Sequence, residues 1–181
     1  MTRYVRINDD NLCAEFIDFE PHGRFHPSIR WLKVPENLDG LINHDYIANG
    51  DSLEPPSLDY LRDQLKAQLA AHRFEIETGG VTLPDGSRIL TDRESQAQLT
   101  SAFQTLTQPF VDKIDWKGAD GWVTVTEVEL RPIAQAVAQH VQGCFKAERQ
   151  VSESIDAAED AEALYGIDIT GAFEKALSTF Q

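Results

Sequence analysis

The longest amphipathic pattern in the chain runs from residue 126 to about residue 163. Small or apolar residues recur there at every third or fourth position, the spacing that places side chains on one face of an α-helix. This stripe consists of Leu130, Ala134, Val137, Val141, Cys144, Ala147, Val151, Ile155 and Ala158. Its steps alternate as in a heptad repeat as far as Cys144, and Glu148 then interrupts the repeat. The pattern predicts one long, heptad-like helix with a single flaw.

Both ends of this helix are marked in the sequence. Thr126 and Glu129 fit the T-x-x-E capping box, in which the two side chains satisfy free amides of the first helical turn. Pro132 follows that turn and predicts a bend, and Gly166 is the predicted stop.

The apolar face of the long helix needs a cover, because a narrow apolar stripe between polar flanks is unfavourable in water. Two interpretations are open. Either the chain's own helices cover the stripe, or the stripe docks a partner or a second copy of the chain. In the second interpretation, the interface residues on this helix are Val137, Val141, Val151 and Ile155.

The first 54 residues have the alternating apolar and polar pattern of short strands. Strands are predicted at residues 3–8, 12–19 and 29–34, the first two joined by a turn at residues 8–11. A short hairpin is predicted at residues 45–53, because Asn49-Gly50 is a strong turn signal. Residues 1–54 therefore predict a small antiparallel β module, and Pro55-Pro56 ends it.

The remainder of the chain is mainly helical in pattern. Helices are predicted from residue 58 to about 74, from a second T-x-x-E box at residue 91 to about 107, and at residues 171–180. A hairpin is predicted at residues 81–90, and a short strand at residues 123–125 leads into the long helix. The expected fold is α+β, with a β module (1–54), a helical domain (58–165) and a short helical tail (166–181).

Composition narrows the class of partner. Of the 181 residues, 16 are Lys or Arg and 30 are Asp or Glu, which gives a formal net charge of −14. Phosphate attraction requires a basic surface, so this balance argues against a nucleic-acid or anionic-membrane partner. No apolar run approaches membrane-spanning length, and the first residues do not read as a signal peptide. Because Cys13 and Cys144 form no recognisable disulfide pattern, we expect the chain to fold in a reducing cytoplasm.

Residues that carry chemistry do not assemble into a recognisable catalytic, cofactor or metal motif. His22 and His26, preceded by Glu20, are the nearest approach to a metal cluster, but prolines and a glycine place them in a loop, and no third ligand has a spacing that matches the two histidines. His72 and His140 lie on predicted helices with no nucleophile paired to them by any motif. The expected protein is therefore not an enzyme and holds no metal or cofactor.

The three tryptophans are further candidates for a partner interface. Trp116 and Trp122 bracket a predicted turn, and Trp31 lies in a predicted strand. Large aromatic residues near turns serve either as core anchors or as interface anchors, and both interpretations stay open here.

Four segments of the second part resemble an uncharacterised C-terminal domain found in proteins of tailed bacteriophages and prophages. They are AAHRFEIETGG, RILTDRESQAQLTSAFQTL, DWKGADGWVTVT and AVAQHVQGCFKAER, in that order, and the resemblance covers about residues 58–158. The segment FHPSIRWLKVPENLDG is similar to the small β module that often precedes this domain.

The resemblance implies a phage tail-associated protein without catalytic activity. Such a protein is either a chaperone for tail fibre assembly or a small structural subunit of the tail, baseplate or fibre. Its implied partner is a tail fibre or baseplate protein, with a homo-oligomer formed through the long helix as a further expectation. Its implied location is the host cytoplasm during assembly, or the virion tail. The alternatives are a surface-acting hydrolase of the tail and a prophage regulator that binds a host factor.

Overall fold

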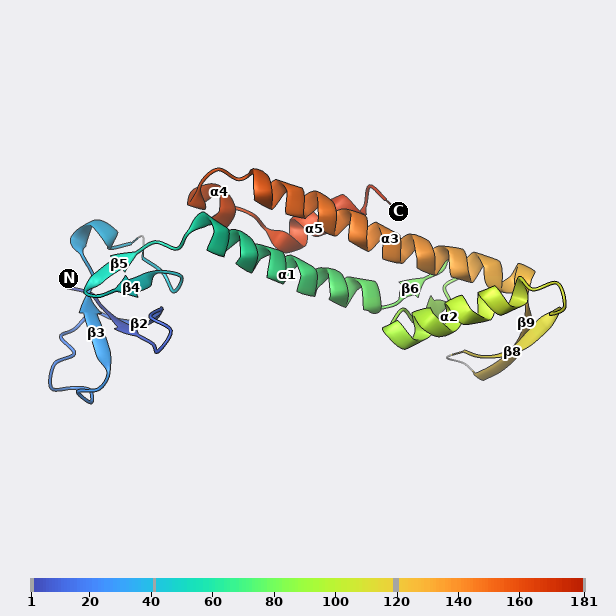
Figure 1. Ribbon diagram of the computed structural model, residues 1–181, viewed down its shortest axis with the longest axis horizontal. Coiled ribbons are helices and arrows are strands. Elements are labelled where there is room, and N and C mark those ends of the chain that lie inside the picture. The colour runs from blue at the N-terminus through green and yellow to red at the C-terminus, as the bar shows by residue number, and fades with distance from the viewer. Residues whose placement is uncertain (1, 41, 119–120, 181) are drawn as a thin grey trace. The chain divides into compact units, whose positions relative to one another are not determined.

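The structure is a computed structural model that describes residues 2–40, 42–118 and 121–180 (Figure 1). The chain divides into two compact units, residues 1–61 and 62–181, so that the boundary falls in the first turn of helix α1. The predicted α+β class is confirmed, because short antiparallel strands precede a mainly helical part that contains one long helix.

The first unit is built on a three-stranded antiparallel sheet. Strand β1 (Tyr4–Ile7) lies between β2 (Cys13–Ile17) and β3 (Arg30–Lys33). A single 3₁₀ turn (Glu36–Leu38) and the hairpin of β4 (Ile47–Asn49) and β5 (Ser52–Glu54) follow. Their inward-facing side chains form one buried cluster: Val5, Ile7, Cys13, Leu32, Val34, Ile42, Ala48 and Leu53.

The second unit contains three helices that run side by side. Helix α1 (Leu58–Thr78) lies antiparallel to α3 (Glu127–Ala157), because Lys66 bonds to Asp156 and Arg73 bonds to Glu148. Helix α5 (Ile169–Leu177) packs along α3 (Figure 1). Gly143 permits this close approach, since a Cβ atom there would lie 3.3 Å from Leu177 Cδ1.

The other end of α3 is covered by different elements. Helix α2 (Arg93–Leu106) packs against α3, and two hairpins flank it, β6 (Val81–Thr82) with β7 (Arg88–Ile89) and β8 (Lys113–Gly118) with β9 (Gly121–Thr126). The buried residues shared by α2 and α3 are Leu99, Ala102, Leu106, Leu130 and Val137. Residues 119–120, at the tip of the β8–β9 hairpin, lie outside the described part of the chain.

The start of the long helix is confirmed, but its predicted end is wrong. The Glu129 carboxylate accepts hydrogen bonds from the Thr126 N–H (2.9 Å) and hydroxyl (2.8 Å), and the helix continues through Pro132. It ends at Ala157, where the backbone becomes extended and Arg62 donates to the carbonyl oxygen of residue 158 (2.8 Å). A separate helix α4 (Ala161–Tyr165) follows, and Gly166 ends that helix instead.

Two further predictions need correction, those for the cap of α2 and for the segment before β9. Thr91 does not cap α2; Asp92 is the N-cap and accepts from the Ser95 N–H at 3.0 Å, while Thr91 is buried. Trp116 and Trp122 were predicted to bracket a turn with no strand before it, but residues 113–118 form strand β8, which contains Trp116. Residues 166–181, predicted as a tail, include α5, whose Phe173 is fully buried in the second unit.

Candidate functional site

The apolar stripe of α3 is mostly covered by the chain itself. Val137 belongs to the cluster under α2, and Val151 and Ile155 are buried on the half of α3 flanked by α1 and α5. Val141 is half-buried and lines a groove between α2 and α3. For Val137, Val151 and Ile155, the structure therefore supports the interpretation in which the chain's own helices cover the stripe.

The three candidate tryptophans lie in different surroundings. Trp31 is half-buried in β3, and its ring centroid lies 4.8 Å from that of Phe25. Trp116 is half-buried against the α2–α3 cluster and so acts as a core anchor. Trp122 is 72% exposed, with Lys117 Nζ 5.7 Å from its ring centroid. Of the three, Trp122 presents most of its surface to solvent.

The β8–β9 hairpin is a two-stranded ribbon with two different faces. The strands pair in register from Lys113 opposite Thr126 to Gly118 opposite Gly121. Because side chains alternate between faces, one face carries Ile114, Trp116, Val123 and Val125. Three of these four, Ile114, Trp116 and Val125, pack against the α2–α3 cluster. The other face carries Lys113, Asp115, Lys117, Trp122, Thr124 and Thr126.

Exposed apolar side chains occur in this ribbon and in the segments that precede and follow it. Phe110, in the segment just before β8, is 82% exposed, and Val128, in the first turn of α3, is 76% exposed. Both lie next to the paired ends Lys113 and Thr126, while Trp122 lies toward the tip of the hairpin. Large apolar side chains that are exposed to solvent are favoured as anchors in protein interfaces.

A groove between α2 and α3 is lined in part by residues of the α2–α3 cluster. It has a volume of about 520 Å³, an apolar floor that includes Phe103 and Val141, and a polar rim with several glutamines. The rim residues include Gln96, Thr100, Gln104, Arg131, Gln135 and Gln142. This groove is a concave surface that could bind a side chain of a partner.

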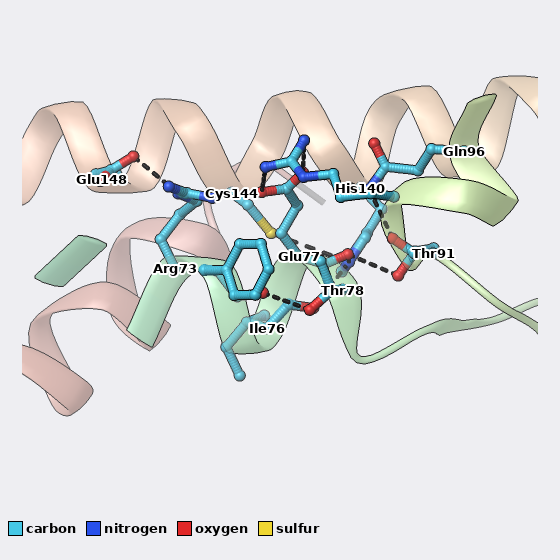
Figure 2. A network of polar contacts seen from close by, with 11 residues as sticks. Arg73, Ile76, Glu77, Thr78, Thr91, Gln96, His140, Cys144 and Glu148 are labelled. Atoms are coloured by element: carbon cyan, nitrogen blue, oxygen red, sulfur yellow. Dashed lines mark hydrogen bonds and ion pairs between the residues drawn. The ribbon is translucent and has the colours of Figure 1, made fainter. Parts of the chain in front are cut away.

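A buried carboxylate, Glu77, lies where α1, α2 and α3 meet (Figure 2). Arg93 contacts both of its oxygens, with Nη1 2.9 Å from Oε1 and Nη2 3.1 Å from Oε2. Arg73 of the same helix forms a second ion pair, and Gln96 Nε2 donates to Oε1 at 3.2 Å. A fully buried carboxylate requires such partners, because an unpaired charge in the interior is very costly.

Arg73 extends this network to the long helix. Its Nε donates to Glu148 Oε2 at 3.0 Å, and its guanidinium lies 4.7 Å from the ring centroid of Phe145. Burial disfavours the charged form of Arg73, but its bonds to Glu77 and Glu148 outweigh burial and raise the pKa of the guanidinium. The residue that interrupts the heptad repeat of α3 is thus an ion-pair partner of α1.

The same region caps the end of α1. The last four carbonyl groups of a helix have no partner within the helix. His140 Nε2 lies 3.1 Å from the carbonyl oxygen of Ile76 and 3.2 Å from that of Glu77, so this nitrogen carries the proton (Figure 2). The buried Thr91 hydroxyl donates to the Glu77 carbonyl at 2.6 Å and accepts from the Gly80 N–H at 2.8 Å.

The side chains of this network stabilise the packing of the helices. Cys144 Sγ lies 4.0 Å from His140 Nε2, but burial raises the pKa of the Cys144 thiol to about 11, so the thiol stays protonated at neutral pH. The carboxylate of Glu77 has no exposed surface, and all its described neighbours are donors. The arrangement fixes α1, α2 and α3 to one another.

Sequence reasoning did not find this network. Arg73 and Glu77 have the i,i+4 spacing of a helical ion pair, the one local signal that pointed to it. Arg93, Gln96 and Thr91 come from 14 or more residues further along the chain, and a single sequence does not show which of its arginines reaches a distant carboxylate.

The described residues contain no group of three or more His, Cys, Asp or Glu side chains placed to hold a metal ion. In the first unit, Glu20 instead accepts from the Tyr4 hydroxyl, and His26 Nδ1 lies 2.8 Å from Ser28 Oγ. Across the described ranges, no helix combines the length and apolar character needed to cross a membrane.

These features define a two-unit α+β protein whose helical unit is organised by a buried ion network. Residues 60–171 match the family described as "Domain of unknown function (DUF4376)". The matched span is more than half of the chain, and the chain belongs to this family. No curated protein matches the chain, and no solved structure does so.

Proposed function

We propose that the chain is a non-enzymatic protein of a bacteriophage tail that acts by binding other proteins. It serves either as a chaperone for tail fibre assembly or as a small structural subunit of the tail, baseplate or fibre. The expected partner is a tail fibre or baseplate protein.

The contrast between buried polar groups and exposed apolar groups supports a binding role. Glu77, His140 and Cys144 are buried and hydrogen-bonded within the structural network. Around the β8–β9 ribbon, in contrast, Phe110 and Trp122 present most of their surface to solvent. This exposed apolar set is the observation that carries the proposal, because such side chains are favoured as anchors in protein interfaces.

The assignment to a phage tail is supported by the four resembling segments. They occupy residues 70–80, 88–106, 115–126 and 136–149, all inside the span that matches the family. The network around Glu77 and the outward-facing Trp122 both lie in these segments. The acidic balance of the chain also fits a protein partner better than a nucleic acid.

Mass spectrometry of purified virions tests the proposal, with the infected-cell lysate analysed in parallel. Presence in virions at a fixed ratio to the tail fibre makes the chain a structural subunit. Absence from virions, with recovery from the lysate bound to the fibre, makes it an assembly chaperone. Absence from both would overturn the tail assignment.

Each of the two alternative functions, a hydrolase and a prophage regulator, predicts a different experimental result. A surface-acting hydrolase would release reducing sugars from host envelope polysaccharide, and the purified chain is expected to release none. A prophage regulator would be recovered from the lysate with a host protein in place of the fibre. Either result would replace the proposed function.

A further inference from the structure

Strand β9 is an unprotected sheet edge. Among the described residues, β8 is its one strand partner, which leaves the opposite edge of β9 open. Natural proteins usually protect such edges with charged residues, prolines or bulges. The sequence of β9, Gly-Trp-Val-Thr-Val-Thr, contains none of these, and four of its residues are β-branched. Strand β8, in contrast, carries Lys113, Asp115 and Lys117.

The backbone groups of β9 that face this open edge can be identified. The Thr126 N–H donates to Glu129 Oε2, so it points away from β8. Successive residues of a strand direct their N–H and C=O groups alternately to the two sides. The N–H and C=O groups of Trp122 and Thr124 therefore also point away from β8, toward the open edge.

We propose that β9 pairs in antiparallel fashion with β9 of a second copy of this chain, across a two-fold axis at Thr124. Thr124 then lies opposite its own counterpart, and Trp122 lies opposite Thr126 of the other copy. Each Thr124 N–H donates to the Thr124 carbonyl of the other copy, and each Trp122 N–H donates to a Thr126 carbonyl. The Thr126 N–H keeps its bond to Glu129.

This register also covers an apolar residue that is poorly covered in one chain. Val123 is on the face that packs against the α2–α3 cluster, yet it is 51% exposed. In the proposed pairing it lies opposite Val125 of the second copy, as a cross-strand pair of β-branched side chains. The two ribbons then form one continuous four-stranded sheet.

The charged residues of the ribbon favour self-pairing at the β9 edge over self-pairing at the β8 edge. An antiparallel self-pairing of β8 about Asp115 would place Asp115 against Asp115 and Lys113 against Lys117 of the second copy. Like charges directly opposite are unfavourable in a sheet. The pairing of β9 places no charged residue opposite another, so the second copy is expected at β9.

Complementary charge substitutions at the two-fold position test this geometry. The unmodified full chain is expected to sediment as a dimer, and Thr124→Lys and Thr124→Glu are each expected to sediment as monomers. An equal mixture of the two variants is expected to recover the dimer mass, because the introduced lysine then faces the introduced glutamate. Such recovery requires that residue 124 face itself across the axis, and circular dichroism checks that both variants stay folded.

Cysteine crosslinking provides a second test with a matched control. The two native cysteines are buried, so a new exposed cysteine dominates oxidation. Thr124→Cys is expected to form a disulfide-linked dimer, since paired residues in adjacent strands lie about 5.5 Å apart, within disulfide reach. Asp115→Cys lies on the same face, directly opposite in the ribbon, but the two copies of residue 115 would be about 14 Å apart, beyond disulfide reach.

Three results would overturn the inference. One is an unmodified chain that remains a monomer at all accessible concentrations. Another is crosslinking of the Asp115→Cys variant in preference to the Thr124→Cys variant. The third is a Trp122 or Thr124 amide that becomes protected from hydrogen exchange only when tail fibre protein is added, which would place a partner's strand at the edge. The first two readouts use the chain alone and do not depend on the tail assignment, which the composition of virions tests.

Discussion

The two halves of helix α3 are covered by different elements and to different extents. Along its C-terminal half, Ala147, Val151 and Ile155 are almost completely buried between α1 and α5. Along its N-terminal half, α2 and the β8–β9 ribbon cover Leu130 and Val137, but Trp122 of the ribbon remains exposed to solvent. The same long helix therefore contributes to a closed core at one end and to an open apolar surface at the other.

Along this one helix, the residues expected to stabilise the fold and the residues expected to bind a partner therefore lie in different halves. The buried network of Glu77 lies between the two halves, where it fixes α1 and α2 to α3. Substitutions in the closed half should therefore act on folding, and substitutions on the outer face of the ribbon should act on association. The comparison can be tested by measuring both quantities for each variant.

The largest expected effect comes from the closed half. Phe173 of α5 is fully buried, with its ring centroid 5.1 Å from that of His72. Phe173→Ala should lower the free energy of unfolding by about 3–5 kcal/mol, because it removes buried apolar surface and leaves a cavity. Urea unfolding followed by circular dichroism measures this loss. A loss below about 1 kcal/mol, the usual size for a less constrained site, would show that α5 is not part of the core.

The next effect comes from the network between the halves. Glu77→Gln keeps the size of the side chain but leaves Arg73 and Arg93 without their shared carboxylate. The expected loss of stability is about 2–3 kcal/mol, since the largely buried Arg73 and the more exposed Arg93 both lose a charged hydrogen-bond acceptor that is itself fully buried. Glu153→Gln is the matched control, because the Arg149–Glu153 pair is exposed and its loss should cost less than about 1 kcal/mol. Equal losses in the two variants would contradict a structural role for the network.

Local patterns in the sequence were sufficient to predict much of the fold. The alternation at residues 3–8 and 12–19, the Asn49-Gly50 turn and the Thr126–Glu129 box each specify structure through neighbours in the chain. Most of the α3 stripe was also predicted correctly, because six of its nine positions are buried: Leu130, Val137, Cys144, Ala147, Val151 and Ile155. These features depend on the chain within a few residues, which a single sequence shows directly.

The predictions that were wrong concern features that depend on contacts between residues far apart in the chain. The end of α3 at Ala157 involves Arg62, which lies 96 residues from Ala158, and no local stop signal precedes it. Strand β8 was missed because its lysines and aspartate resemble a polar turn, although Ile114 and Trp116 alternate with them. Thr91 was assigned to a cap from its T-x-x-E spacing, but its hydroxyl instead donates to the backbone carbonyl of Glu77, 14 positions earlier in the chain.

A pair of tryptophan variants tests the open half directly. Trp116 packs against the α2–α3 cluster, whereas Trp122 lies on the outer face of the same ribbon. Trp116→Ala should cost about 2 kcal/mol of stability, less than for a fully buried tryptophan because the side chain is half-exposed. Trp122→Ala should change stability by no more than about 0.5 kcal/mol. Both are compared by urea unfolding in a Thr124→Lys background, and a larger loss for Trp122→Ala would reverse the assignment of the two faces.

The smallest expected effect is a pH dependence at the junction of β9 and α3. Hydrogen bonds from the Thr126 N–H and hydroxyl lower the pKa of Glu129 below its ordinary value of 4.5. A carboxylate with a lowered pKa stabilises the fold above that ordinary value, and this contribution is lost as the pH falls through the lower, folded-state pKa. Thr126→Val removes the hydroxyl but keeps the N–H, so it should raise the Glu129 pKa only part of the way back. An NMR titration of the Glu129 side chain measures both values. A Glu129 that titrates at its ordinary pKa in the unmodified chain would show that the cap is not formed in solution, and the Thr126 N–H would then be free to join the open edge of β9.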